Sequence, residues 1–275
     1  MLNKPINVVG AGLAGSLVAR VLRSHGFEVR VIDDMDQFSA SQASSNLYIN
    51  HWLKKFSAAQ AKRGVRVLER LFHDKIEEPF ANGLGYAAQV KHIPQRAVLV
   101  EPDVTGKVVE VTDAGCMVDG VGFSNGATVL CTGYRASELV DLDVDIKVGH
   151  CFLVRGRLPK GKSRIAMISP YKHEKLYQFD ENHIYYADSV GLKLSAYWKR
   201  QEELKARTLE RLRRHVPDAE VVDFRVGYRP LTLGYDFGLL SRHSDWVWSV
   251  NGGGKNGLVA YAALAEQLVE ALEKP

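Results

Sequence analysis

The sequence predicts an α/β fold, because it opens with a strand–turn–helix–strand unit, continues through a strand-rich middle and closes with one apolar helix. Residues 6–9 are expected to form the first apolar strand, and residues 28–32 the second. Between them, apolar residues recur on one helical face until Gly26 ends the helix. The residues of that face are Leu17, Val18, Val21 and Leu22.

The later elements follow from the same patterns of apolar spacing and turn residues. Residues 39–46 are rich in Ser, Ala and Gln, which predicts a loop. Alternating residues on both sides of Asp113-Ala114-Gly115 indicate a hairpin within residues 107–118. The remaining elements that we expect are helices at residues 56–75, 195–215 and 258–272 and strands at residues 127–133, 150–155 and 183–187.

Length and composition describe an ordinary globular protein. The chain has 275 residues, of which 46% are hydrophobic and 25% charged, so a sizeable core is available. It has no run of 18 apolar residues and no signal-peptide pattern at its start, which favours a soluble, cytoplasmic protein. The three cysteines lack C-x-x-C or metal-ligand spacing, so we expect buried thiols in a reducing compartment and no metal site. They are Cys116, Cys131 and Cys151.

The net charge of +4 is unevenly distributed along the chain. Residues 147–214 contain 16 Lys or Arg and seven Asp or Glu residues, a net charge of +9. A solvated basic helix face is the simple explanation for such an excess. Because the excess is confined to one region, an anionic partner is the alternative.

The first turn carries a dinucleotide-binding fingerprint. Gly10, Gly12 and Gly15 follow a strand and open a helix, and Asp33 lies 18 residues after the last of them. The glycines permit a tight turn, close approach of the pyrophosphate and close packing of helix on strand. The helix N-terminus then offers free N–H groups to the phosphates. Asp33 suits the adenosine ribose and would repel a 2′-phosphate, which argues against NADP. The fingerprint does not distinguish NAD from FAD.

Three further segments resemble those of the glycine oxidase and D-amino-acid oxidase family of flavoproteins, and the resemblance covers nearly the whole chain. Residues 43–46 (Ala-Ser-Ser-Asn) are similar to the small-residue loop that packs on the pyrophosphate and flavin in that family. Residues 127–139 are similar to its strand and threonine–glycine turn near FAD. Residues 252–258 (Gly-Gly-Gly-Lys-Asn-Gly-Leu) are similar to the run before its last helix, whose N-terminus points at the flavin pyrimidine ring.

The resemblance implies a Rossmann-like FAD-binding domain assembled from residues 1–55, 97–146 and 225–275, with an inserted mixed, β-rich substrate-binding domain formed by residues 56–96 and 147–224. No cysteine or histidine lies at an evident flavin-attachment position, so the FAD is expected to be non-covalent. The residues expected to bind it are Gly10, Gly12, Leu13, Ala14, Gly15, Asp33, Asp34, Ser44, Ser45, Asn46, Val108, Thr132, Gly133, Gly253, Gly254, Lys255, Asn256, Gly257 and Leu258.

The substrate side depends mainly on Arg229, within the segment Gly-Tyr-Arg-Pro at residues 227–230. In amino-acid-oxidising members of the family this arginine holds the substrate carboxylate, and a guanidinium can do so through two parallel hydrogen bonds. The alternative is a structural arginine that pairs with Asp236. Lys255 would add positive charge beside the reduced flavin, unless it is a solvated loop lysine. Further candidates are Tyr185, Tyr186 and His51, although isolated residues of these types more often have structural roles.

These observations predict an FAD-dependent enzyme that oxidises the C–N bond of glycine or an amino-acid-like amine. Hydride would pass from the substrate Cα to flavin N5, the imine would hydrolyse and an acceptor would reoxidise the flavin. The family resemblance and the basic region leave a second hypothesis, in which the amine is carried by nucleic acid, such as a modified DNA or tRNA base. A flavoprotein maturation partner without turnover is a third. Oligomeric state, electron acceptor and substrate size do not follow from the sequence.

Overall fold

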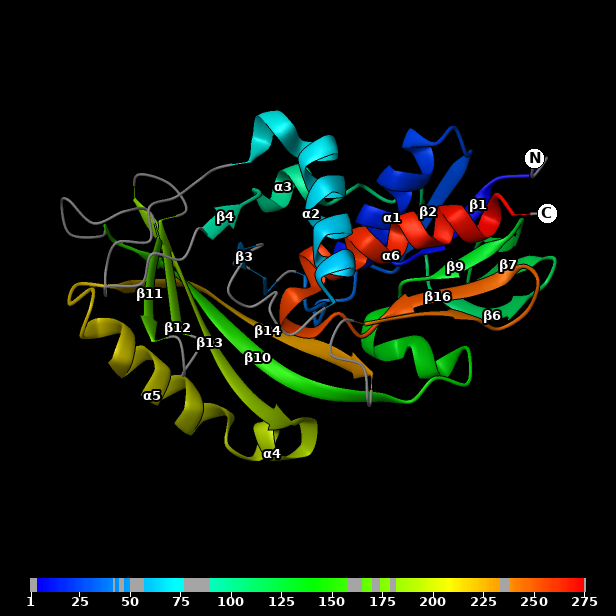
Figure 1. Cartoon of the computed structure of the whole chain (residues 1–275). Coiled ribbons are helices and arrows are strands. Elements are labelled where there is room, and N and C mark those ends of the chain that lie inside the picture. Colours follow the sequence, from blue (N-terminus) through cyan, green and yellow to red (C-terminus); the bar gives the residue numbers. More distant parts are fainter. Residues whose placement is uncertain are drawn as a thin grey trace.

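The computed structural model describes residues 4–41, 43–44, 47–49, 57–76, 90–157, 165–169, 174–178, 182–232 and 238–274. Within these residues the chain forms two principal sheets that lie side by side, with helices on the outer face of each (Figure 1). One sheet is built from strands within residues 6–130 and 239–251, and the other from strands within residues 144–232. This arrangement confirms the expected combination of a Rossmann-like layer with an inserted β-rich layer.

The first sheet has six strands in the order β15-β16-β9-β1-β2-β5. Its central strands are parallel, and β15 is antiparallel to β16 at the edge. The buried strands at its centre are short and apolar, as a sheet covered on both faces requires. The strands are β1 (Ile6–Val9), β2 (Val29–Asp33), β5 (Val104–Thr105), β9 (Thr128–Leu130), β15 (Leu239–Arg242) and β16 (Val247–Asn251).

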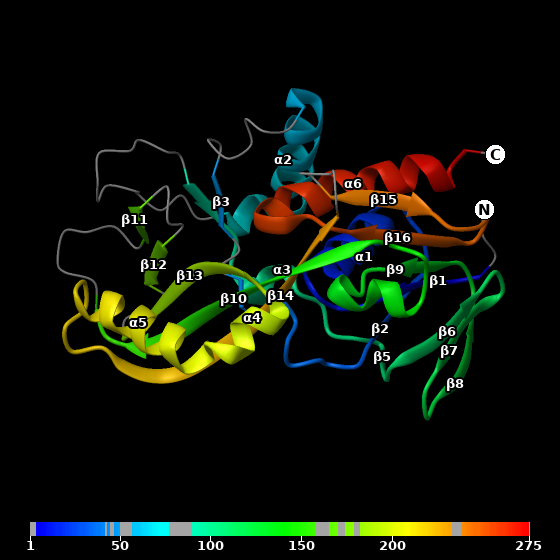
Figure 2. The same cartoon turned by 90° about the horizontal axis from the view of Figure 1, so that it is seen from below.

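Helices cover one face of this sheet and a small meander covers the other (Figure 2). The helices share one hydrophobic core with the sheet. On the opposite face, Val108, Cys116 and Val118 of the meander pack against Ile32 and Leu130. The helices are α1 (Leu13–Ser24), α2 (Ala58–Phe72), α3 (Gln95–Val98) and α6 (Gly257–Leu272), and the meander strands are β6 (Val108–Thr112), β7 (Gly115–Val118) and β8 (Gly122–Asn125).

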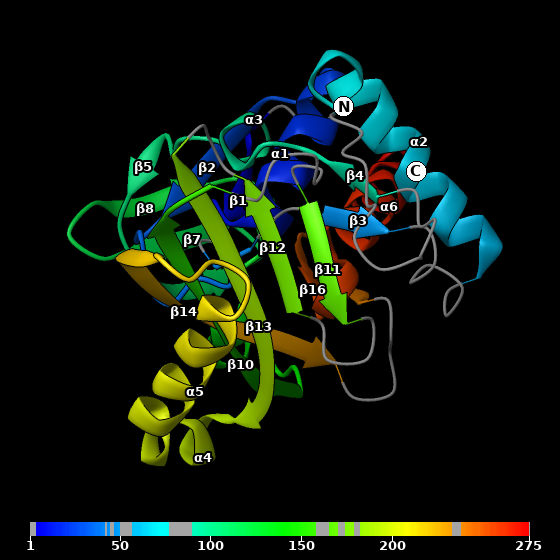
Figure 3. The same cartoon turned by 90° about the vertical axis from the view of Figure 1, so that its left-hand side faces the viewer.

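The second sheet is antiparallel, with the order β11-β12-β13-β10-β14 (Figure 3). Two helices pack on its outer face, where Phe152, Ile184 and Tyr186 form a core with Leu212. The strands are β10 (Val144–Arg155), β11 (Ile165–Ser169), β12 (Glu174–Gln178), β13 (His183–Lys193) and β14 (Glu220–Thr232), and the helices are α4 (Leu194–Lys199) and α5 (Gln201–Arg213).

The remaining described elements are short. The strands β3 (Leu47–Ile49) and β4 (Val90–His92) pair with each other in antiparallel fashion. Three 3₁₀ elements lie in the described residues, namely η2 (His73–Lys75), η3 (Gly133–Glu138) and η4 (Gly254–Asn256). None of the helices in the described ranges is long and apolar enough to cross a bilayer.

Two sequence-based expectations need correction. The charged helix expected at residues 195–215 is divided into α4 and α5, because the backbone leaves the helical range at Arg200 (φ −124°, ψ 12°). The expected domain boundaries at residues 146/147 and 224/225 fall inside continuous strands. β10 and β14 pair along one ladder from Val144 opposite Thr232 to Arg155 opposite Glu220. Residues 144–146 and 225–232 therefore belong to the five-stranded sheet, and Arg229 is carried by that sheet.

Candidate active site

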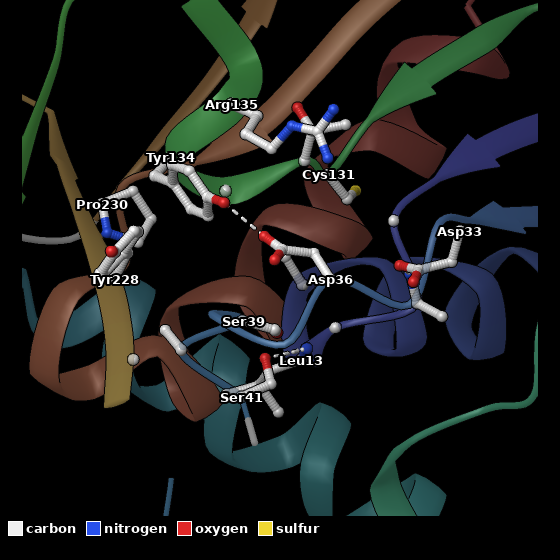
Figure 4. A pocket seen from close by; sticks show the side chains of 18 of the residues that line it. Leu13, Asp33, Asp36, Ser39, Ser41, Cys131, Tyr134, Arg135, Tyr228 and Pro230 are labelled. Atoms are coloured by element: carbon white, nitrogen blue, oxygen red, sulfur yellow. Dashed lines mark hydrogen bonds between the residues drawn. The ribbon is translucent and has the colours of Figure 1, made fainter. Parts of the chain in front are cut away.

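A cavity of about 310 Å³ lies where the carboxyl ends of β1, β2 and β9 meet the five-stranded sheet. The carboxyl edge of a parallel sheet is the usual position for a nucleotide site in this class of fold. The cavity is lined by the first glycine turn, the turn after β9, the start of α6 and residues 227–230 of β14. It thereby joins four segments that are far apart in the sequence (Figure 4).

The first glycine turn has the close contacts that its sequence predicts. Gly10 has φ +106°, and a β-carbon there would lie 2.5 Å from the carbonyl oxygen of Cys131. A β-carbon on Gly12 would meet the hydroxyl of Ser41 at 3.0 Å. Ser41 also accepts a hydrogen bond of 2.6 Å from the Leu13 N–H at the start of α1. The turn is thus held open as a backbone cradle beside the N-terminus of a helix, which suits an anionic group.

Asp33 ends β2 at the edge of the cavity, as expected. Its carboxylate accepts hydrogen bonds from the backbone N–H groups of Ala11 (2.5 Å) and Met35 (2.6 Å). Burial raises the pKa of Asp33, and these two hydrogen bonds oppose the rise. Asp34 also lines the cavity, where it forms an ion pair with Arg135.

The turn after β9 and the C-terminal loop are connected to each other. Thr132 and Gly133 line the cavity, and Asn251 donates a hydrogen bond of 2.7 Å to the carbonyl of Gly133. Val108 lines the cavity from β6, and Ser44 lines it from the loop after β2. The segments singled out by the family resemblance therefore lie around one space in the described part of the chain.

Tyr261 of α6 contacts the C-terminal glycine loop through its hydroxyl and its ring. The Tyr261 hydroxyl accepts a hydrogen bond of 3.0 Å from the Gly253 N–H. A β-carbon on Gly253 would lie 2.7 Å from the Tyr261 ring, and one on Gly257 would lie 2.9 Å from it. Gly254, Gly257, Leu258 and Tyr261 line the cavity. The backbone of Lys255 and Asn256 belongs to η4, and the side chain of Lys255 lies outside the described atoms.

Arg229 extends from β14 into the same cavity. It is half-buried, since protein surrounds it while its side chain remains accessible from the cavity. Burial lowers its pKa and the neighbouring Tyr261 opposes that effect, but a guanidinium stays charged at neutral pH. Gly149 of β10 leaves room for it, because a β-carbon there would lie 3.3 Å from Arg229 Nη2. The cavity thus contains a positive charge where it meets the five-stranded sheet.

The two candidate tyrosines point to opposite faces of β13, as successive strand residues must. The hydroxyl of Tyr185 lies 2.7 Å from Cys151 Sγ on the face that carries Arg229. Tyr186 is fully buried under α5, which corrects the expectation that it contacts substrate. Neither side chain lines the cavity. The other candidates, His51, Ser45 and Asn46, lie outside the described residues, as does Asp236, the alternative partner of Arg229.

Several cavity residues escaped the sequence analysis. Ser41 falls in a segment whose composition predicts only a loop, and Tyr261 falls inside the last helix without any motif. The sequence places Tyr134 and Arg135 in the turn after β9 but indicates no role for them. The structure brings all four to the cavity wall. The spacing of Tyr261 from Gly257, one helical turn, is the one signal that could have indicated its contact with the loop.

Several of the basic residues in residues 147–214 form ion pairs with nearby acids. Arg200 pairs with Glu203 at 2.7 Å, and Arg214 pairs with Glu210 at 2.5 Å, both on exposed helix surface. Arg155 pairs with Glu220 at 2.7 Å across β10 and β14. Such exposed pairs are typical of a solvated face. They favour the simpler explanation of the charge run in this part of the chain.

Comparison with known proteins supports the fold assignment. A family model described as an NAD(P)-binding Rossmann-like domain matches residues 8–71. No curated protein matches the chain by sequence. The solved structure of an iminodiacetate oxidase from a Chelativorans species matches with a TM-score of 0.71 and 16% identity, over 98% of this chain and 96% of the other.

Two further solved structures give the same result. A glycine oxidase from Bacillus cereus matches with a TM-score of 0.72 and 14% identity, over 99% of this chain and 96% of the other. An L-proline dehydrogenase from P. horikoshii matches with a TM-score of 0.69 and 12% identity, over 98% and 93% of the two chains. The expected resemblance to the glycine oxidase family is therefore confirmed at the level of the fold.

Proposed function

We propose that this chain, which has the fold of the glycine oxidases and related amine oxidases, binds FAD non-covalently and oxidises the C–N bond of a small amine or amino acid. The observation that carries the proposal is the shared cavity. One continuous space joins the fingerprint glycines, the C-terminal glycine loop and the guanidinium of Arg229. A bound cofactor and a substrate anion would therefore lie next to each other.

The residues around the cavity fit FAD at each part of the molecule. Gly12 and the start of α1 would hold the pyrophosphate, because any side chain at Gly12 would fill the space in front of Ser41. Asp33 would accept hydrogen bonds from the ribose. The C-terminal loop and the start of α6 would face the flavin ring. NAD alone would leave this second glycine loop without a role, which favours FAD.

Bound FAD would supply the hydride acceptor for the reaction. The protein's own part is to bind and orient the substrate and to stabilise charge. Arg229 would hold a substrate carboxylate through paired hydrogen bonds and so fix the position of the reacting carbon. The N-terminus of α6 would stabilise negative charge on the reduced cofactor by about 0.3–1 kcal/mol. Positioning and electrostatics are sufficient for this chemistry, so a dedicated side-chain base is not required.

A small substrate is the favoured class, because the structural neighbours bear the names of small-molecule enzymes, namely an iminodiacetate oxidase, a glycine oxidase and an L-proline dehydrogenase. The hypothesis of a nucleic-acid substrate is supported here by the net positive charge of residues 147–214. Maturation without turnover is a further hypothesis that shares the same cofactor.

The deciding experiment is anaerobic reduction of the purified protein. We expect a yellow protein whose flavin absorbance bleaches on addition of glycine, iminodiacetate or proline. A colourless protein that does not take up FAD would contradict the cofactor assignment. A yellow protein that none of these amines bleaches would contradict small-amine oxidation. Nucleic-acid binding that weakens steeply with salt would then favour the nucleic-acid substrate.

A further inference from the structure

Two neighbouring residues of η3 contact two acids in the loop that follows β2. Tyr134 donates a hydrogen bond to the carboxylate of Asp36, and Arg135 forms an ion pair with Asp34. All four residues line the cavity. In Figure 4 the Tyr134–Asp36 bond lies above the first glycine turn, between η3 and Ser39. The two elements are otherwise separated by about a hundred residues of chain, since Tyr134 and Asp36 are 98 positions apart.

Through Glu138, the charge interactions of Arg135 extend to Lys107, which lies just before β6. Glu138 lies 3.4 Å from Arg135 Nε and also 3.4 Å from Lys107 Nζ, at the turn that precedes β6. Glu138 and Lys107 line the cavity as well. The side chain of Arg135 is only 18% exposed, so its charge interactions are less screened by solvent than those of the surface pairs on α5.

Aromatic side chains of β14 and α4 pack against the same loop, which follows β2. Phe38 stacks on Tyr228 with ring centroids 4.8 Å apart, and Tyr134 meets Tyr228 edge-on at 4.9 Å. The Tyr228 N–H donates a hydrogen bond of 3.0 Å to the Phe38 carbonyl. Trp198 of α4 donates a hydrogen bond of 3.0 Å to the Tyr228 hydroxyl. Contacts therefore hold the loop at Phe38 as well as at Asp34 and Asp36.

The backbone between the two acids is strained. Met35 has φ +58°, a left-handed conformation that residues with a side chain rarely adopt, and it is 53% exposed. Strained backbone persists when surrounding contacts hold it in place. Those contacts are the carboxylate of Asp33, which accepts the Met35 N–H, and the two acid pairs on both sides.

We propose that the pairs Tyr134–Asp36 and Arg135–Asp34 form a latch that holds the loop of residues 34–38 over the nucleotide part of the cofactor and slows its dissociation. Tyr134 and Arg135 are thus positioning residues for the cofactor. This inference rests on the proposed function, since it takes FAD to be the ligand of the cavity. The latch acts where the adenosine half would lie, because Asp34 directly follows the ribose-binding candidate Asp33.

The test is the rate at which FAD leaves the holoenzyme, measured from the rise in flavin fluorescence after dilution. Tyr134→Phe removes one hydrogen bond and keeps the ring, so we expect dissociation about fivefold faster. Arg135→Gln removes the ion pair, and we expect dissociation about tenfold faster. The association rate should change less than twofold in both variants.

Two controls separate a latch from a general loss of stability. Arg155→Gln removes an exposed arginine–carboxylate ion pair that does not line the cavity and should leave the FAD dissociation rate unchanged. The thermal unfolding of the apoproteins shows whether the Tyr134 and Arg135 variants still fold, and Asp36→Asn replaces Tyr134→Phe if that variant does not. Wild-type dissociation rates in both latch variants would overturn the latch and leave the proposed function intact. Absence of FAD binding by the wild-type protein would overturn both.

Discussion

Gly15 of α1 packs directly against the backbone of Gly10. A β-carbon at position 15 would overlap the carbonyl oxygen of Gly10 and would lie 3.2 Å from the β-carbon of Cys131. The helix, the glycine turn and the turn after β9 therefore meet at one point. This contact sets how closely the start of α1 approaches the sheet, and so where the phosphate cradle lies.

Gly15→Ala is expected to lower the free energy of unfolding by about 3 kcal/mol, because neither backbone can move without separating α1 from the sheet. FAD affinity should fall with it. Gly26→Ala is the matched control, since Gly26 has φ +83° but nothing within 4 Å of a new β-carbon. Its cost should be limited to backbone strain, about 1–2 kcal/mol, with unchanged FAD affinity. Chemical denaturation and FAD titration measure both. Equal effects of the two variants on FAD affinity would contradict the role given to Gly15.

Tyr261→Phe should destabilise the conformation of the C-terminal glycine loop. The variant leaves the buried Gly253 N–H without its acceptor, which costs about 1–3 kcal/mol. Burial raises the pKa of Tyr261 to about 12, so the hydroxyl stays neutral and keeps this role across the usual pH range. We expect weaker FAD binding and an altered flavin absorption spectrum. Tyr197→Phe, which removes a buried hydroxyl bonded to His150, should leave that spectrum unchanged. An unaltered spectrum and FAD affinity in Tyr261→Phe would show that the loop does not need the phenol.

Local signals predicted the nucleotide-binding half of the fold well. The turn from Gly10 to Gly15 occupies a short stretch, and its conformation follows from residues that are neighbours in the chain. The acid at Asp33 ends an apolar strand, so its place at the carboxyl edge follows from the strand itself. The C-terminal loop could be placed at the same cavity only through the family resemblance.

The contacts of Tyr134 and Arg135 with the loop after β2, and the exact extent of the five-stranded sheet, could not be predicted because they depend on contacts between distant residues. Nothing near Tyr134 in the sequence indicates Asp36 as its partner. The alternation of β13 predicts that Tyr185 and Tyr186 face opposite sides, but not which side the helices cover. The wrong boundary within β14 has the same origin, since strand pairing with β10 is what assigns Arg229 to the five-stranded sheet.

Arg229→Gln should raise KM for a substrate with a carboxylate by about 100-fold, the effect of losing a charged, two-point hydrogen bond. Arg229→Lys should recover only part of the loss, because an ammonium cannot form the paired contact. An amine without a carboxylate should be affected little. The control is Arg225→Gln on the same strand, since Arg225 pairs with Asp223 at 2.6 Å and does not line the cavity. Equal losses for substrates with and without a carboxylate would contradict anion binding by Arg229.

His150 should make the stability of the five-stranded sheet and its two helices sensitive to acid. It is 2% exposed, and its ring nitrogens contact the hydroxyls of Tyr197 (3.2 Å) and Thr208 (2.9 Å), which joins β10 to α4 and α5. Burial lowers its pKa to about 4 from the usual 6.5, so the folded chain keeps the imidazole neutral. Between these two values the unfolded chain binds more protons than the folded chain. The free energy of unfolding should therefore fall by up to about 3 kcal/mol as the pH is lowered from about 6.5 to about 4.

The variant His150→Gln isolates this effect, because glutamine retains hydrogen-bonding capacity but does not titrate in that range. Carboxylates also titrate at the acid end of the range, and they do so in both proteins, so the difference between the two unfolding curves reports His150 alone. We expect the difference in unfolding free energy to be constant above pH 7 and to shift in favour of the variant as the pH falls to 4. Parallel pH profiles for the two proteins would show that the buried imidazole is protonated without cost to the fold.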